Sequence, residues 1–385
     1  MALKRHRLAQ RRRAFGHSQE RLADLLGIER STVGRWERAE TSPLPYIRPK
    51  LAAELRITLE ELADLLDEVE PADGDGNEHL DQVLSNPASV DLITTAHLWQ
   101  RVQALTDEYD HVPSALLLAA AGQCHGQVSY LRQNAASNRV RRELFAVEAE
   151  SATLMGQLVW DACQRRDHAT SLRYFNEAIT AARQIRDRFT EAHAQLRKSY
   201  VALYGHGDSH NGLGLAKSAA RTVADTSPSL AGIALMHVGE AHAMLGEHGR
   251  CHAALEAAQS HFVRADDADP AGEFFTPTDH ARLTGSCHLY LGSPASAVST
   301  LAALPQDGSK SDAIVLGNLS LAHIRLRNLD EAVASLHQAI TVVEGTRGGG
   351  GLNLVFTAGR ELHPWRRERP VQEITDRLLA LMSAA

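Results

Sequence analysis

The chain has 385 residues, enough for two or more domains, and its 44% content of hydrophobic residues is normal for a globular protein. Aromatic residues make up only 5% while Ala and Leu are plentiful, which disfavours a β-sandwich and predicts an all-α fold. The formal net charge of −7 argues against a polyanion-binding protein until it is divided along the chain.

The charge is distributed unevenly. Residues 1–56 contain 13 Lys and Arg against 6 Asp and Glu, which leaves 27 basic and 41 acidic residues in the remainder. A basic N-terminal segment therefore precedes an acidic body. Only this segment suits a polyanion such as DNA.

The cysteines and the N-terminus indicate the compartment. The four cysteines lie tens of residues apart without a paired spacing, and the first residues lack the apolar core of a signal peptide. The longest apolar run, Ala115–Ala121, is too short to cross a bilayer. We therefore expect a cytoplasmic protein with reduced thiols and no membrane segment.

Residues 19–38 have the pattern of two helices that cross at a tight turn. Ser18 is a suitable N-cap for a helix over Gln19–Leu26, Gly27 suits a left-handed turn, and a second helix is predicted over Arg30–Arg38. The positions where the two helices must meet are all apolar: Leu22, Leu26, Ile28, Val33 and Trp36. Because Val33 and Trp36 point inward, the rest of the second helix presents a polar face that can enter a major groove.

The flanking residues extend this unit to five short helices. Upstream, a run of basic residues is predicted as a first helix: Lys4, Arg5, Arg7, Arg11, Arg12 and Arg13, with Leu3 and Leu8. Downstream, Ile47, Leu51 and Leu55 continue the apolar stripe. Thr58 and Glu61 form a capping box for a fifth helix over Leu59–Leu66.

The segment RRAFGHSQERLADLLGIERSTVGRWERAETSPLP, followed by LAAELRITLEEL, resembles the Cro/cI-type (xenobiotic response element) helix-turn-helix family. The resemblance implies a five-helix DNA-binding domain at residues 1–70. One departure is Glu29, which stands where the family often has a Ser or Thr cap. The alternative is an ordinary small helical bundle with scattered arginines.

The same resemblance implies which residues touch double-stranded DNA. Gln19 takes the place of a family glutamine that braces the DNA backbone, and the early residues of the third helix reach base edges. The implied DNA-binding residues are Gln19, Arg30, Ser31, Thr32, Arg35 and Arg38.

A linker and a repetitive body follow. The segment PADGDGNE, residues 71–78, is rich in Pro, Gly and acids and is predicted as a linker to a body at 79–385. Four segments of the body share a pattern of a small turn followed by an amphipathic helix: RRDHATSLRYFNEAITAARQ, GEHGRCHAALEAAQSHF, GSPASAVSTLAAL and RNLDEAVASLHQAI. Each is preceded by another helix.

These pairs resemble the tetratricopeptide repeat, with starts near residues 152, 193, 232, 278 and 313. The resemblance implies an α-solenoid of helical hairpins with a concave inner surface. The inner-facing positions of the first helices, taken from the tetratricopeptide pattern, are Trp160, Arg197, Met236, Glu240 and Arg282. They could hold the backbone and the terminal carboxylate of a peptide, or merely pack between turns of the superhelix.

Catalytic and metal chemistry find little support in the sequence. His248, Cys251 and His252 lie close together but lack the paired spacing of a zinc site. The segment GTRGGGGL, residues 345–352, lacks the Lys and Ser or Thr of a phosphate loop and is predicted as a flexible connection. We expect no enzyme activity, no metal and no cofactor.

The complete architecture resembles actinobacterial regulators of this type and, more distantly, the peptide-sensing regulators of quorum systems. It implies a sequence-specific transcriptional regulator that binds DNA as a homodimer and whose body binds a peptide or small-molecule effector that tunes operator affinity. The alternative is a DNA-localised scaffold whose repeats recruit a protein partner without a small effector.

Overall fold

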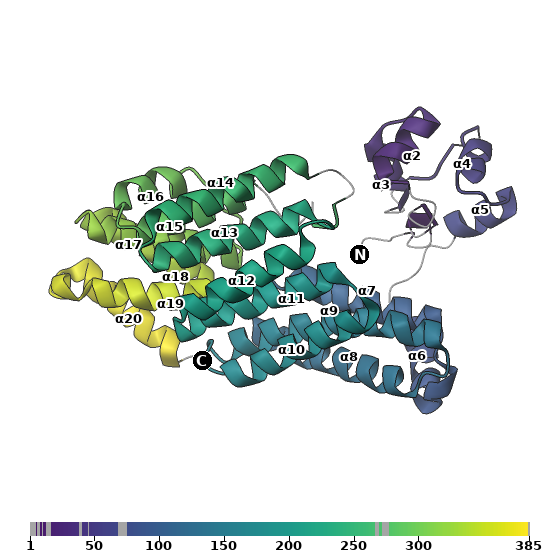
Figure 1. Cartoon of the computed structure of the whole chain (residues 1–385), viewed down its shortest axis with the longest axis horizontal. Helices are drawn as coiled ribbons and strands as arrows, with labels where there is room; N and C mark the ends of the chain where they lie inside the picture. The colour runs from purple at the N-terminus through teal and green to yellow at the C-terminus, as the bar shows by residue number, and fades with distance from the viewer. Residues whose placement is uncertain are drawn as a thin grey trace. The chain divides into compact units, whose positions relative to one another are not determined.

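The computed structural model divides into two compact units, Met1–Gln82, here called the head, and Val83–Ala385, here called the body (Figure 1). Its description covers residues 5, 8–9, 11–12, 17–37, 41–44, 46–67, 75–265, 269–271 and 277–383. Within these ranges all regular secondary structure is helical, as the composition predicts. Each unit has its own core and is described by itself.

The head contains the predicted pair of crossing helices, α2 (Gln19–Leu26) and α3 (Arg30–Glu37). The Ser18 hydroxyl caps α2 by accepting a 3.0 Å hydrogen bond from the amide of Arg21, and Gly27 ends the helix with φ of 73°. Helices α4 (Arg48–Glu54) and α5 (Leu59–Asp67) follow. The apolar residues that define the pattern form one buried core: Leu8, Leu22, Ala23, Leu26, Val33, Trp36, Ile47, Leu51, Ala52, Leu55, Leu62 and Leu66.

The capping box predicted for α5 is present. The amide of Thr58 donates to Oε2 of Glu61 at 2.8 Å, and the amide of Glu61 donates to Oγ1 of Thr58 at 3.1 Å. These hydrogen bonds lower the pKa of Glu61 below its ordinary value.

Two arginines of the basic N-terminal run are structural. Arg5 and Arg12 are buried, with 6% and 4% exposure. The guanidinium of Arg5 donates to the carbonyl oxygens of Trp36, Thr41 and Leu66 at 2.7 to 3.1 Å. It thus satisfies carbonyl groups at and beyond the C-terminal ends of α3 and α5. Arg5 and Arg12, which belong to the run predicted as a basic first helix, are therefore not available to solvent as charged surface groups.

The predicted linker falls on a region that is described only in part. Residues 71–74 and Arg38 lie outside the described residues, and residues 75–78 belong to α6 (Asp75–Ser85). The bounds predicted for the DNA-binding domain (1–70), the linker (71–78) and the repetitive body (79–385) remain predictions.

The body is a stack of helical hairpins (Figure 1). After a 3₁₀ turn (Pro87–Ser89), α7 (Leu92–Glu108) and α8 (Ser114–Asn134) form the first hairpin, and six more follow. The second and third hairpins are α9 (Asn138–Ala162) with α10 (His168–Ile185), and α11 (Arg188–Tyr200), which continues into a π-helical turn (Val201–His206), with α12 (Ser209–Val223). The fourth and fifth are α13 (Pro228–Met244) with α14 (His248–Arg264), and α15 (Pro277–Tyr290) with α16 (Pro294–Leu301). The sixth and seventh are α17 (Lys310–Arg325) with α18 (Leu329–Thr346), and α19 (Gly349–Glu361) with α20 (Arg369–Ser383).

The glycine-rich segment 345–352 is not the flexible connection that the sequence predicts. Gly349, Gly350 and Gly351 form the first turn of α19, which packs against α17. A Cβ atom at Gly351 would lie 2.3 Å from Cβ of Ala313, so only glycine permits this approach. The low helix propensity of glycine is thus outweighed by tertiary packing.

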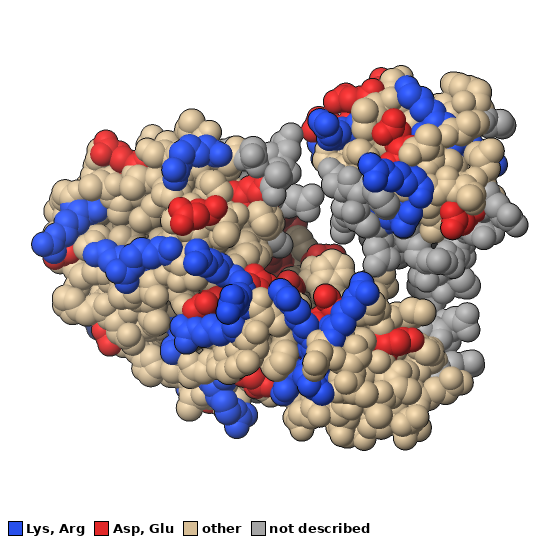
Figure 2. Space-filling view, turned by 45° about the vertical axis from the view of Figure 1, so that its right-hand side comes forward, with Lys and Arg blue, Asp and Glu red and all other residues tan. Residues whose placement is uncertain are grey.

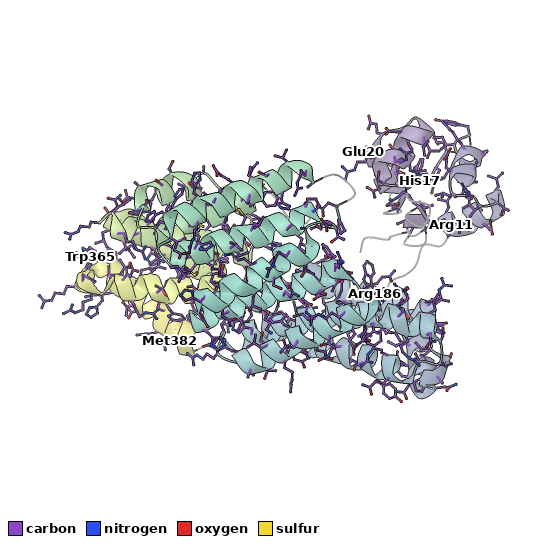
Figure 3. All side chains as sticks on the ribbon, in the orientation of Figure 1. Arg11, His17, Glu20, Arg186, Trp365 and Met382 are labelled. Atoms are coloured by element: carbon purple, nitrogen blue, oxygen red, sulfur yellow. The ribbon has the colours of Figure 1, made fainter. Side chains whose placement is uncertain are left out.

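The last helix covers the end of the hairpin stack. Val371, Ile374 and Leu378 of α20 are buried in the core formed with α17, α18 and α19. Leu379 and Met382 are exposed. Met382 lies near the C-terminal end of the helix (Figure 3). In the part of the chain described above, none of the helices has the length and apolar character that spanning a membrane requires.

Candidate nucleic-acid interface and ligand cavity

Helix α3 buries its apolar side chains and exposes its polar ones. Val33 and Trp36 are 1% and 3% exposed, whereas Arg30, Ser31 and Arg35 lie on the surface and Thr32 is half-buried. Nη2 of Arg35 donates to Oγ1 of Thr32 at 3.2 Å, and Oγ of Ser31 donates to Oε2 of Glu29 at 3.2 Å. Basic side chains are exposed on the visible face of the head (Figure 2).

Gln19 is fixed by a residue that the sequence analysis did not select. Its Nε2 donates to Oε2 of Glu37 at 2.6 Å, and Glu37 is itself buried in an ion pair with Arg12, with Nε and Oε1 2.7 Å apart. Glu37 follows Val33 by four residues and so lies on the inner face of α3. This spacing is the sequence signal that could have identified Glu37 as a buried partner. The ion pair and this hydrogen bond therefore join Arg12, which precedes α2 in the chain, to the start of α2 and the end of α3.

The body contains a cavity of about 380 Å³ on the inner side of the hairpin stack. Residues of five successive first helices line it, those of α11, α13, α15, α17 and α19, together with Tyr109, Asp110 and Arg165. A repeat places equivalent helix faces beside one another, which explains why residues tens of positions apart meet here. The volume lies at the lower end of the range for small-molecule sites.

The structure brings four of the five predicted effector-binding residues close together. Arg197, Glu240 and Arg282 line the cavity, and Trp160 lines an adjoining cavity of about 40 Å³ that shares Arg197 and several other residues with the first. Met236 does not line either cavity. It is fully buried and packs with Ala258 and Leu283, because α13 is apolar on more than one side.

Glu240 is the centre of a buried hydrogen-bond network. Its carboxylate accepts from Oγ of Ser286 at 2.6 Å and from the hydroxyl of Tyr204, and Nδ1 of His237 lies 3.2 Å away. Desolvation raises the pKa of Glu240, but hydrogen bonds from His237, Ser286 and Tyr204 outweigh it and hold the pKa below its ordinary value. Desolvation lowers the pKa of His237. At neutral pH the network therefore holds a carboxylate and an uncharged imidazole.

A second group of residues was missed from the sequence because it lies outside the repeat pattern. Arg165 stacks on Trp160 at 4.2 Å and donates to Oδ1 of Asp161 at 3.0 Å, and the hydroxyl of Tyr109 donates to Oδ2 of the same carboxylate at 2.6 Å. Nζ of Lys310 donates to the carbonyl oxygen of Tyr109 and to a serine of α8. These contacts join α17 to the first hairpin and close one side of the cavity.

The histidine and cysteine group considered for zinc does not converge. Cys251 is buried against Cys287, whereas His248 and His252 are exposed. In the described part of the chain, no three potential ligands among His, Cys, Asp and Glu lie together as a metal site would require.

Residues 8–62 match the helix-turn-helix family model. The match spans α2, α3 and α4 and ends within α5. The head thus carries a helix-turn-helix domain, which suggests a transcriptional regulator.

Comparison with solved structures found a likeness to PlcR of Bacillus thuringiensis, solved in complex with the peptide PapR7 and DNA. The two chains are 17% identical, the likeness covers 67% of this chain and 94% of that chain, and the TM-score is 0.30. A likeness at this level says nothing about the ligand or the assembly of the present protein. No curated protein sequence matched the chain.

Proposed function

We propose that the protein is a sequence-specific transcriptional regulator that reads operator DNA with α3 and whose body binds a small effector that tunes operator affinity. The observation that carries the proposal is the polar outer face of α3 in a head that matches the helix-turn-helix model. The cavity in the body supplies a place for the effector.

DNA recognition is assigned to α3 and to the start of α2. Arg30, Ser31, Thr32 and Arg35 are placed to reach base edges, and Gln19 braces a phosphate; Arg38, outside the described residues, keeps its predicted role. An arginine that contacts guanine with two hydrogen bonds contributes about 1–3 kcal/mol of discrimination. Arg35 is the best candidate because its side chain is exposed and, among the described residues, donates to a neighbouring hydroxyl, that of Thr32.

The second copy of the chain is proposed as the partner on DNA. A single helix-turn-helix reads one half-site, so two heads are needed for paired half-sites about one helical turn apart. Ile93 on α7 and Leu116 on α8 are each 71% exposed, and the two helices pack against one another. Because the two helices are antiparallel, Ile93 and Leu116 lie near opposite ends of the hairpin, and Leu116 is the apolar side chain that we propose for self-association of the body. Light scattering of the full chain and of Leu116→Asp tests it: the wild type should be a dimer and the variant a monomer.

Effector control needs a difference in affinity. A ligand changes operator binding only if it binds two arrangements of the protein with different free energies. The test starts with selection of bound genomic fragments and footprinting, followed by operator titrations with and without a small-molecule fraction of a cell extract. A change in operator affinity supports the sensor. A stoichiometric protein partner and no effect of the fraction would support the scaffold instead.

A further inference from the structure

The cavity walls contain hydrogen-bond donors that lack partners. Nε1 of Trp160, a residue that is 3% exposed, has no hydrogen-bond partner, and Nε of Arg282 is buried without one. Among the described residues, Arg282 has one ion pair, a 3.4 Å contact between its Nη2 and Asp279. Buried donors are normally satisfied, so each such group calls for a partner.

Arg197 lies in the wall of both cavities and lacks a counter-ion. Its Nε donates to Nε2 of His193 at 3.2 Å, and within the described residues its Nη atoms have no hydrogen bond and no carboxylate partner. Desolvation lowers the pKa of His193 to about 3, so the imidazole is uncharged and can accept this hydrogen bond at neutral pH. Within the described residues, the guanidinium of Arg197 therefore contacts the ring of Tyr200, whose centroid is 5.4 Å away, but no carboxylate.

The two buried carboxylates near these donors are already occupied. Glu240 accepts from Tyr204 and Ser286 and lies against His237, while Asp161 accepts from Tyr109 and Arg165. Asp110 also lines the cavity, but it is exposed. Among the buried groups described at the cavity, the unmet hydrogen-bonding capacity is thus one of donors. A ligand that completes it must bring acceptors, and beside two guanidinium groups the strongest acceptors are those of an anion.

We propose that the cavity binds a small organic anion whose carboxylate or phosphate lies between Arg197 and Arg282. The apolar part of the ligand lies against Leu203, Leu283 and Ile314, which line the same cavity. Trp160 supplies a further donor from the adjoining cavity. The volume of about 380 Å³ favours a compact molecule over an extended peptide. This inference rests on the proposed function, because the anion would be the effector.

The test uses the full chain and three probes of similar size. Phenylacetate carries a carboxylate, phenyl phosphate carries a phosphate, and phenylacetamide is a neutral control. Titration calorimetry is performed up to millimolar concentrations on the wild type, Arg197→Gln, Arg282→Gln and the control Arg369→Gln. Arg369 is 90% exposed on α20 and lines neither cavity.

One anion should bind the wild type at one site per chain, about tenfold or more tightly than phenylacetamide, because two charge-assisted contacts are made. The preferred anion distinguishes a carboxylate effector from a phosphate effector. Arg197→Gln and Arg282→Gln should lose the preference for the anion, and Arg369→Gln should keep it. If Arg197→Gln or Arg282→Gln does not fold, as judged by circular dichroism, the Lys variant at the same position, Arg197→Lys or Arg282→Lys, replaces it and should weaken the preference in part.

Equal binding of the anions and the amide, no binding of either anion, or a preference that persists in both cavity variants would overturn the inference. Operator affinity is measured on the same proteins. If the wild type binds its operator but fails these ligand tests, the anion inference fails while the DNA-binding function stands. If it binds neither DNA nor the anions, both proposals fail.

Discussion

Gln19 and Glu37 are joined by a hydrogen bond of 2.6 Å from the amide nitrogen of the first to the carboxylate of the second. The same carboxylate is paired with Arg12, and the guanidinium of Arg12 also donates to the carbonyl oxygen of His17 at 2.6 Å. A side chain expected at a DNA phosphate is thus held in place by a buried ion pair at the opposite end of the neighbouring helix. The same ion pair therefore holds both α3, which is proposed to contact bases, and Gln19, which is proposed to contact a phosphate.

Replacing Glu37 with Met should therefore destabilise the head strongly. The substitution leaves Arg12 buried without its counter-ion, which costs about 3–5 kcal/mol. Hydrogen exchange followed by mass spectrometry on the full chain should show faster exchange in α2 and α3 and unchanged exchange in the body. Glu20→Met, at an exposed position of α2, is the control. Unchanged exchange in Glu37→Met would show that the ion pair does not support the head.

Because α19 packs closely on α17, replacing Gly351 with Ala should change the stability of the body in the opposite direction from replacing Gly126, which has free space around it. Gly351→Ala should lower the free energy of unfolding of the body by about 1–3 kcal/mol, because the new methyl group overlaps Ala313. Gly126→Ala in α8 should raise it by about 0.5–1 kcal/mol, since a Cβ there has no atom within 4 Å and glycine is a poor helix former. Urea unfolding followed by circular dichroism measures both changes. Equal effects of the two substitutions would contradict the packing.

The stability of the body should fall as the solution becomes more acidic. Desolvation and, less strongly, Arg197 lower the pKa of His193 from its ordinary 6.5 to about 3. Between these values the unfolded chain binds a proton that the folded chain does not, so the free energy of unfolding decreases as pH falls through this window. The slope for one such group is at most about 1.4 kcal/mol per pH unit.

Urea unfolding at pH about 7 and about 5 measures this slope for the wild type and for His193→Gln. The variant should have a smaller slope because its side chain does not titrate. The control His252→Gln changes an imidazole that is 76% exposed and should keep the wild-type slope. An unchanged slope in His193→Gln would mean that this imidazole is not excluded from water.

Local sequence patterns were sufficient to predict the crossing helices of the head, because a cap, a turn residue and the period of the apolar residues determine where these helices begin, end and pack. The cap at Ser18, the left-handed turn at Gly27 and the inward positions of Val33 and Trp36 all follow from helix periodicity. The roles of Arg5 and Arg12 could not be predicted in this way. An arginine that binds carbonyl groups or a buried carboxylate has the same sequence signature as one that binds phosphate.

From the sequence, only those cavity residues that stand at equivalent positions of the repeat could be predicted. Arg197, Glu240 and Arg282 recur on the inner faces of first helices and meet in the structure. Lys310 and Tyr109 are 201 residues apart and come together through the curvature of the whole stack, for which no local pattern exists. The glycines of α19 were assigned to a connection because propensity favours a loop there, while their fit against α17 is a tertiary property.

The most direct test of the account is the DNA affinity of the full chain with and without Arg35. Operator and random duplexes are compared by fluorescence anisotropy over a range of salt concentrations for the wild type, Arg35→Ala and the body control Arg369→Ala. We predict salt-sensitive binding by the wild type, a loss of about 1–3 kcal/mol for the operator in Arg35→Ala with a much smaller loss for random DNA, and no loss in the control. Equal losses on both duplexes would make Arg35 a phosphate contact, and the absence of salt-sensitive binding by the wild type to any duplex would contradict the central claim.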